Sequence, residues 1–213
     1  VAVTPRLVAV SKTKPVEQLM EVYDAGHRYF GENYVQEILD KAPVMPADIQ
    51  WHFIGHLQSN KVNSLIKGVP SLFMVETVDS AKLASKLNSA VGEAARAKLN
   101  VMVQVNTSGE ESKFGVNPED CLSLARHIVM DCQHLQFKGL MTIGMPDYTS
   151  RPENFTCLNK CRDEVCAELK LDVADVELSM GMSGDFESAI EMGSTNVRVG
   201  STIFGARDYS ASK

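Results

Sequence analysis

The feature that most constrains this chain is a regular alternation of short apolar runs with amphipathic stretches along its whole length. Runs such as RLVAVS (6–11), NVMVQVN (100–106) and NVRVGS (196–201) have the length and composition of buried strands. The stretches between such runs place apolar residues at the 3.6-residue period of a helix, as in residues 16–23 after the first run. About eight strand-then-helix units can be counted in this way, a pattern typical of a parallel sheet covered by helices.

Two folds fit an unbroken alternation of this kind: an open doubly wound sheet and a closed (β/α)8 barrel. A number of units close to eight favours the barrel, and no G-x-G-x-x-G turn follows the first apolar run. Since no linker or low-complexity segment divides the chain, we predict a single (β/α)8 barrel domain over residues 1–213. The first strand begins almost at the first residue, so we expect that a natural N-terminal segment precedes it. Closure of the N-terminal end of the barrel is then an open question.

Composition excludes several classes of partner. The net charge is −6 and no basic tract is present, which argues against nucleic acid. No apolar run approaches the roughly 18 residues that span a membrane. The five cysteines are odd in number and irregularly spaced, which argues against a disulfide framework and favours a reducing compartment. We therefore expect a cytoplasmic protein, with the question of an organelle-targeting segment ahead of residue 1 left open.

Three of the cysteines, Cys157, Cys161 and Cys166, invite comparison with a metal site. The apolar interpretation is stronger, because Cys161 shares one helix face with Phe155, Leu158 and Val165. A fourth ligand at a usual spacing is also missing from this part of the sequence. We therefore expect no metal.

Polar residues gather at the predicted C-terminal ends of the strands, where barrel enzymes carry their reactive groups. The last two strand ends carry the sharpest signal, in the strings MSGDF and RVGST. Loops after the seventh and eighth strands of such barrels often bind phosphate through backbone N–H groups. The competing interpretation is that Ser183 or Asp185 only caps a helix and that Gly200 only fits a turn. Taken together, the two strings favour a phosphate site.

Two charged residues at predicted buried strand positions indicate which phosphate-containing ligand the site would bind. Lys12 lies at the end of the first strand, and lysine is almost never fully buried unless it is paired. Arg198 lies inside the eighth strand, so it either pairs with a strand-end carboxylate, Glu32 or Glu76, or faces a ligand. A lysine that condenses with an aldehyde, a phosphate site and a charged group near a pyridine nitrogen together predict pyridoxal 5′-phosphate (PLP). Unlike aspartate, arginine cannot accept the pyridinium proton, so it weakens the ring as an electron sink.

Several long strings, in the same order along the chain, carry a resemblance to a known family. They are AVSKTKP, FGENYVQE, WHFIGHLQSNK and ELSMGMSGDFESAIEMGSTNVRVGSTIFGARDYS, and the resemblance extends from Leu7 to Ser210. On these strings the chain resembles the pyridoxal-phosphate homeostasis protein family. The resemblance implies a (β/α)8 barrel similar to the N-terminal domain of alanine racemase, without the C-terminal β domain of that enzyme. It also implies that the segment expected ahead of residue 1 is a natural N-terminal helix.

The resemblance also implies a role for individual residues. Lys12 is expected to carry PLP as a Schiff base, with Arg198 near the pyridine nitrogen. The remaining expected cofactor-binding residues hold the phosphate or line the mouth of the barrel: Asn33, Asn60, Met180, Ser183, Gly200 and Ser201. The family is expected to buffer or deliver PLP, with apo PLP-dependent enzymes as possible recipients, and to act as a monomer or weak dimer without robust catalysis.

An enzyme of the same barrel type, such as an amino-acid racemase or decarboxylase, is the alternative. Alanine racemases carry a tyrosine four residues after the lysine, where this chain has Val16. No pair of bases for proton removal is visible in the sequence. These observations favour a carrier with no catalytic residues. A barrel that binds another phosphate compound is a third hypothesis, and it holds only if Lys12 is inert.

Four other polar residues have competing interpretations. Asn33 has Gln36 three residues later, the spacing of a capping box, so a cap and a ligand contact are equally open. We expect His56 to line the mouth rather than to act as an acid–base catalyst. Lys14 precedes a proline and is the weaker candidate for the Schiff base. Lys113 is expected to be solvated, with a secondary role in accepting the cofactor left open.

The protonation state of Lys12 matters because only a neutral amine attacks an aldehyde. We expect burial at the barrel mouth, together with Arg198 nearby, to lower the pKa of Lys12.

Overall fold

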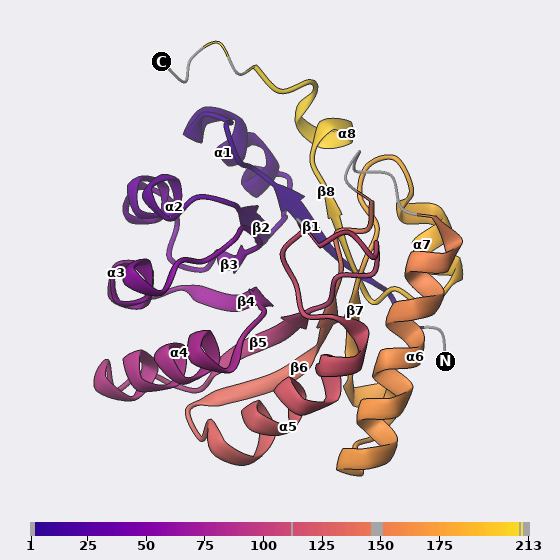
Figure 1. Cartoon of the computed structure of the whole chain (residues 1–213). Coiled ribbons are helices and arrows are strands. Elements are labelled where there is room, and N and C mark those ends of the chain that lie inside the picture. Colours follow the sequence, from indigo (N-terminus) through magenta and orange to yellow (C-terminus); the bar gives the residue numbers. More distant parts are fainter. Residues whose placement is uncertain (1–2, 112, 146–150, 209, 211–213) are drawn as a thin grey trace.

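Eight parallel strands close into a barrel in the computed structural model of the chain, which describes residues 3–111, 113–145, 151–208 and 210. The strands follow one another around the barrel in sequence order, and β1 pairs with both β2 and β8 (Figure 1). The predicted barrel is therefore confirmed, and the open doubly wound sheet is excluded. The strands are β1 (Arg6–Val10), β2 (Tyr29–Glu32), β3 (Gln50–Phe53), β4 (Leu72–Val78), β5 (Leu99–Gln104), β6 (Leu135–Met141), β7 (Glu177–Ser179) and β8 (Asn196–Val199).

Helices follow the strands and surround the sheet (Figure 1). The α-helices are α1 (Val16–Asp24), α2 (Val35–Lys41), α3 (Val62–Gly68), α4 (Ala81–Glu93), α5 (Cys121–Asp131), α6 (Pro152–Leu169), α7 (Phe186–Glu191) and α8 (Ser201–Phe204). Four short 3-10 helices lie in the connections of the described chain: η1 (Ala42–Val44), η2 (Ser59–Lys61), η3 (Pro118–Asp120) and η4 (Val173–Asp175). In the parts of the chain that are described, none of the helices is both long and apolar enough to span a membrane.

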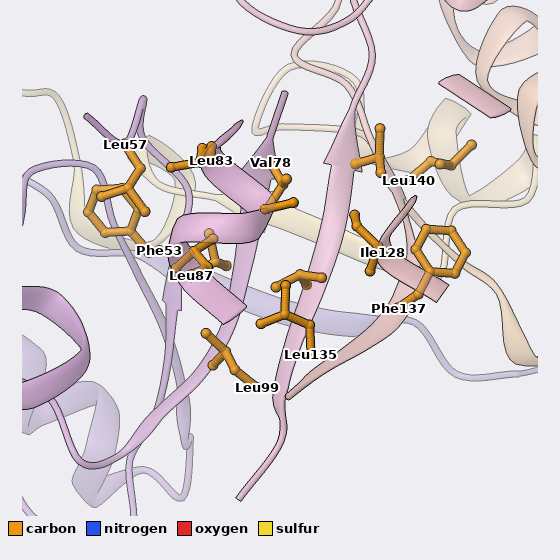
Figure 2. Close-up of a cluster of buried hydrophobic side chains, with 14 of the residues drawn as sticks. Phe53, Leu57, Val78, Leu83, Leu87, Leu99, Ile128, Leu135, Phe137 and Leu140 are labelled. Atoms are coloured by element: carbon orange, nitrogen blue, oxygen red, sulfur yellow. The ribbon is translucent and has the colours of Figure 1, made fainter. Parts of the chain in front are cut away.

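Two layers of packed side chains result from the alternation of faces along each strand. The larger layer lies between the sheet and the helices, where Val78 and Leu99 of the strands pack with Leu83 and Leu87 of α4 (Figure 2). A separate cluster of Met74, Met102 and Met141 lies on the other face of the sheet, inside the barrel. The predicted apolar face of α6, including Cys161, is buried in the outer layer.

An ion pair with two aromatic rings lies at the start of the strands. The Arg6 guanidinium is 3.0 Å from the Glu177 carboxylate, which joins the start of β1 to the start of β7. The same guanidinium lies over the rings of Tyr29 and Phe73, 5.4 and 5.2 Å from their centroids. These contacts join the starts of several strands at the N-terminal end of the barrel.

Candidate functional site

A cavity of about 430 Å³ opens at the C-terminal end of the barrel. Six of the eight residues that the sequence predicted for the cofactor site line it: Lys12, Asn33, Ser183, Arg198, Gly200 and Ser201. The other lining residues are mainly apolar: Val10, Ile54, Met141, Ile143, Met182, Gly184 and Arg207. The volume is within the range of small-molecule sites, and the mixture of apolar walls with a few polar groups is typical of them.

Two predicted residues lie away from this cavity. Met180 follows Ser179, whose side chain faces the barrel interior and contacts Arg198. Because successive strand residues face opposite ways, Met180 points outward, and its side chain is fully buried in the outer core. Asn60 lies in η2, where it is exposed and does not line the cavity. These two residues therefore lie outside the lining of this cavity, and their contact with a cofactor stays a prediction.

The Lys12 amine lies in the wall of the cavity on the turn after β1. Lys12 is partly buried, and its amine makes no hydrogen bond or ion pair to the described part of the chain. Burial and, after it, the positive charge of Arg207 lower the pKa of Lys12 from 10.5 to about 8, while Glu37 and Glu32 oppose the shift. The predicted direction is confirmed, but the neighbouring cation is Arg207 rather than Arg198. The Lys14 amine is engaged elsewhere, since it donates to the carbonyl oxygen of Ala206.

The two C-terminal loops meet through the hydroxyl of Ser183. Its oxygen accepts hydrogen bonds from the backbone N–H groups of Gly200, at 3.1 Å, and Thr202, at 3.4 Å. Ser183 therefore joins the loop after β7 to the loop after β8 rather than capping α7. Asp185 accepts instead from the N–H of Met182, at 2.7 Å.

Backbone donors at this end of the cavity remain available. Within the described residues, the N–H groups of Gly184 and Ser201 donate to no acceptor. A Cβ atom added at Gly184 would meet nothing within 4 Å, so the backbone there is open to the cavity. Unpaired N–H groups beside a serine hydroxyl form a surface suited to an anion such as phosphate.

The Arg198 guanidinium is fixed from behind by a buried polar network. It donates to the Ser179 hydroxyl at 2.6 Å and to the Thr142 carbonyl oxygen at 2.8 Å, and it lies 4.0 Å from the Glu76 carboxylate. Glu76 also accepts from Nδ1 of His52 at 2.6 Å. The predicted pairing of Arg198 with Glu76 is confirmed. Arg198 also lines the cavity, while its contact with a ligand stays a prediction.

The ionisation of Glu76 is set by two opposing effects. Complete burial by itself would raise the pKa of Glu76, but the hydrogen bond from His52 and the charges of His52 and Arg198 outweigh it. The net result is a pKa below the ordinary value, so Glu76 is charged near neutral pH. The other carboxylate considered from the sequence, Glu32, pairs with Lys41 at 2.7 Å instead.

Asn33 lines the cavity and does not cap a helix. Helix α2 begins at Val35 after Tyr34, with no side-chain cap hydrogen bond. The Oδ1 atom of Asn33 is buried and has no hydrogen-bond partner among the described residues. Close contact with the next strand end positions this segment, because a Cβ atom added at Gly55 would lie 1.9 Å from the carbonyl oxygen of Asn33. The capping interpretation is therefore wrong.

Two further predicted side chains lie outside the cavity. His56 is exposed and stacks on the ring of Phe114, with centroids 3.7 Å apart. It stands away from the cavity lining, and so does Lys113. Sequence reasoning missed Arg207 as a site residue, although its position in the C-terminal string GARDYS was the available signal.

Comparisons with known proteins agree with this architecture. The model of the family "Alanine racemase, N-terminal domain" matches residues 2–208. Alanine racemase of Corynebacterium glutamicum has the same fold at 14% identity, with a TM-score of 0.72 over 97% of this chain and 58% of that enzyme.

Closer relatives carry a more specific name. The human pyridoxal phosphate homeostasis protein is 54% identical over 98% of this chain and 79% of its own length. A solved structure of PipY from Synechococcus elongatus, with PLP bound, is 32% identical with a TM-score of 0.80, over 94% of this chain and 92% of PipY. The family-model match and the near-full-length identity show that this chain belongs to the pyridoxal phosphate homeostasis protein family, within the alanine racemase N-terminal-domain barrels.

Proposed function

We propose that this protein binds PLP in the barrel cavity and acts in PLP homeostasis by buffering or delivering the cofactor. The observation that carries the proposal is the Lys12 amine, which has a pKa of about 8 and lies in the same cavity as the unpaired N–H groups of Gly184 and Ser201. A primary amine partly neutral near physiological pH is suited to an aldehyde, and clustered N–H and hydroxyl donors are suited to phosphate. The name of the human relative and the PLP in PipY support the same proposal.

The residues present fit each part of PLP. Lys12 would hold the aldehyde carbon as a Schiff base. The hydroxyls of Ser183 and Ser201 and the unpaired N–H groups of Gly184 and Ser201 would hold the phosphate, with Gly200 beside them in the cavity wall. The unpartnered Oδ1 of Asn33 is a buried acceptor that a ligand in the cavity would satisfy. When bound, PLP supplies an aldehyde that captures primary amines and a ring that withdraws electrons from them.

The charged network favours holding the cofactor over using it for catalysis. Arg198, paired with Glu76, cannot receive a proton from the pyridine nitrogen, which limits the ring as an electron sink. Among the described residues that line the cavity, none is a histidine, tyrosine, cysteine or carboxylate. Val16, at the position of the racemase tyrosine, packs against the hydrophobic core. A second base for proton transfer is thus missing from the described lining.

Part of the proposal goes beyond the site. We propose a cytoplasmic protein, a monomer or weak dimer, that passes PLP to apo-enzymes. Cysteine usage supports the location, because the five cysteines of the chain are free thiols. A racemase or decarboxylase of the same barrel type is the competing function.

Borohydride reduction followed by peptide mapping tests the attachment of PLP. The purified protein is incubated with PLP, reduced, digested and analysed by mass spectrometry. We expect the label on Lys12, and loss of the imine absorbance band in Lys12→Ala but not in the matched variant Lys14→Ala. A label on Lys14, or a full band in Lys12→Ala, would overturn the assignment. Incubation of the PLP-loaded protein with L- and D-amino acids separates carrier from enzyme, because steady turnover of any of them contradicts the carrier.

A further inference from the structure

A buried lysine lies directly behind the turn that carries Lys12. Lys41, the last residue of α2, is only 6% exposed, and its Nζ atom has three partners. It donates to the carbonyl oxygen of Ser11 at 2.8 Å, to Oε1 of Glu32 at 2.7 Å and to Oε1 of Glu37 at 2.6 Å. A lysine ammonium has three N–H donors, so all of them are used. Lys41 therefore joins the ends of β1 and β2 to α2.

The same group of residues holds the other side of Lys12. The backbone N–H of Thr13 donates to Oε1 of Glu37 at 2.5 Å, the same oxygen that accepts from Lys41. Thr13 has φ +66°, in the left-handed region that β-branched residues avoid. Such a conformation persists only where the surroundings impose it. Residues 11 and 13 are thus both attached to Lys41, the first directly and the second through Glu37.

Neither Lys41 nor Glu37 is among the residues that line the cavity, and their hydrogen bonds to this turn are to the backbone of Ser11 and Thr13. The charge of Glu37 has the opposite effect to its geometry. As a nearby negative charge it raises the pKa of Lys12, whereas the turn that it holds keeps the amine partly buried, and burial lowers that pKa. The two effects of Glu37 can therefore be separated by experiment.

We propose that Lys41 and Glu37 are positioning residues that hold the turn from Ser11 to Thr13, so that the Lys12 amine stays inside the cavity. This inference rests on the proposed role of Lys12 in holding PLP. Lys41 supplies the donors that fix Ser11 and Glu37, and Glu37 supplies the acceptor that fixes Thr13.

Acetylation of the apo protein as a function of pH measures the turn without any cofactor. The protein is treated with a limiting amount of acetic anhydride, and the modification of each lysine is quantified by mass spectrometry. In Glu37→Ala the turn loses its acceptor and Lys12 moves toward water. We expect the reactivity of Lys12 at pH 8 to fall at least about tenfold, because an amine with an ordinary pKa near 10.4 is almost fully protonated there. Glu37→Gln keeps an acceptor oxygen without the charge, so its Lys12 should react as fast as in the unaltered protein or faster.

Further variants make the test independent of simple unfolding. Lys41→Met should resemble Glu37→Ala, while Lys82→Met, at an exposed position of α4, should leave Lys12 unchanged. Glycine adopts the left-handed conformation without strain, so Thr13→Gly added to Glu37→Ala should restore part of the reactivity. The far-ultraviolet circular dichroism of every variant is compared with that of the unaltered protein.

The acetylation rates of the two Glu37 variants can also refute the proposal. If only the charge of Glu37 mattered, Glu37→Ala and Glu37→Gln would both make Lys12 more reactive, and the positioning role would be refuted. A second experiment measures the rate of PLP release after dilution. Release should be at least about tenfold faster in Glu37→Ala and Lys41→Met and unchanged in Glu37→Gln. Unchanged release in Glu37→Ala and Lys41→Met would also refute the positioning role. If the unaltered protein binds no PLP, the proposed function fails, while the acetylation arm still decides the positioning of Lys12.

Discussion

Removal of the Glu76 carboxylate should destabilise the barrel strongly, because four groups depend on it. Nδ1 of His52, the Ser179 hydroxyl and Nδ2 of Asn196 donate to it at 2.6, 2.5 and 3.2 Å, and the Arg198 guanidinium lies 4.0 Å away. In Glu76→Leu the charge of Arg198 stays buried without its carboxylate. Breaking a buried ion pair from one side costs about 3–5 kcal/mol of the free energy of unfolding. For a chain of this size, that corresponds to a fall of about 6–20 °C in the midpoint of thermal unfolding.

A double substitution distinguishes the uncompensated charge from simple loss of packing. Glu76→Leu/Arg198→Leu removes both charges, so it should be more stable than Glu76→Leu alone. Asp163→Leu is a matched control, since it breaks the exposed pair with Arg162 and should cost at most about 1 kcal/mol. Urea unfolding followed by circular dichroism gives the free energies. The reasoning would be refuted if Glu76→Leu lowered the free energy of unfolding by less than about 1 kcal/mol, or if the double variant were less stable than Glu76→Leu.

The pH dependence of the same difference provides an independent check. The pKa of Glu76 lies below its ordinary value of 4.5 in the folded state. The carboxylate therefore contributes its full stabilisation above pH 4.5, and this contribution is lost as the pH falls through the folded pKa. The stability difference between the unaltered protein and Glu76→Leu should thus be constant near neutral pH and should shrink below pH 4.5.

Two other perturbations test the cavity. At pH 7 about a tenth of Lys12 is neutral with a pKa of about 8, against about 3 in 10,000 for an amine at 10.5. The fraction of Lys12 in the form that attacks PLP is therefore about 300-fold larger than for an ordinary lysine, and PLP capture should be faster. In stopped-flow absorbance, the capture rate should rise with pH and level off above about 8; a rate still rising tenfold per pH unit at pH 9.5 would contradict this pKa. Gly55→Ala places a Cβ atom 1.9 Å from the carbonyl oxygen of Asn33, so it should lower both the unfolding midpoint and PLP affinity, measured by calorimetry and fluorescence titration. Gly184→Ala, where a Cβ atom meets nothing within 4 Å, should leave the unfolding midpoint unchanged, and equal midpoints for the two variants would contradict the contact at Gly55.

Local patterns in the sequence determined the barrel and most of the strand ends. Hydrophobic periodicity reports which face of each element is buried, and this is set by neighbours in the chain. The end of α3 at Gly68 and the start of η3 at Pro118 follow in the same way from local backbone preferences. The Lys12 and Ser183 loops were found because the C-terminal ends of parallel strands must meet at one end of a barrel.

The tertiary structure alone decided which side chains face the cavity and which charges pair. Met180 and Ser179 are adjacent in sequence, yet the pleat of β7 sends one to the core and the other to Arg198. Asn33 matched a capping spacing, but the close approach of Gly55 holds it at the cavity wall. The cation beside Lys12 is Arg207, about 195 residues away in the chain, because the barrel closes β8 against β1. Ionisation and ligand geometry depend on distances between residues far apart in sequence, and these distances exist only after the barrel has closed.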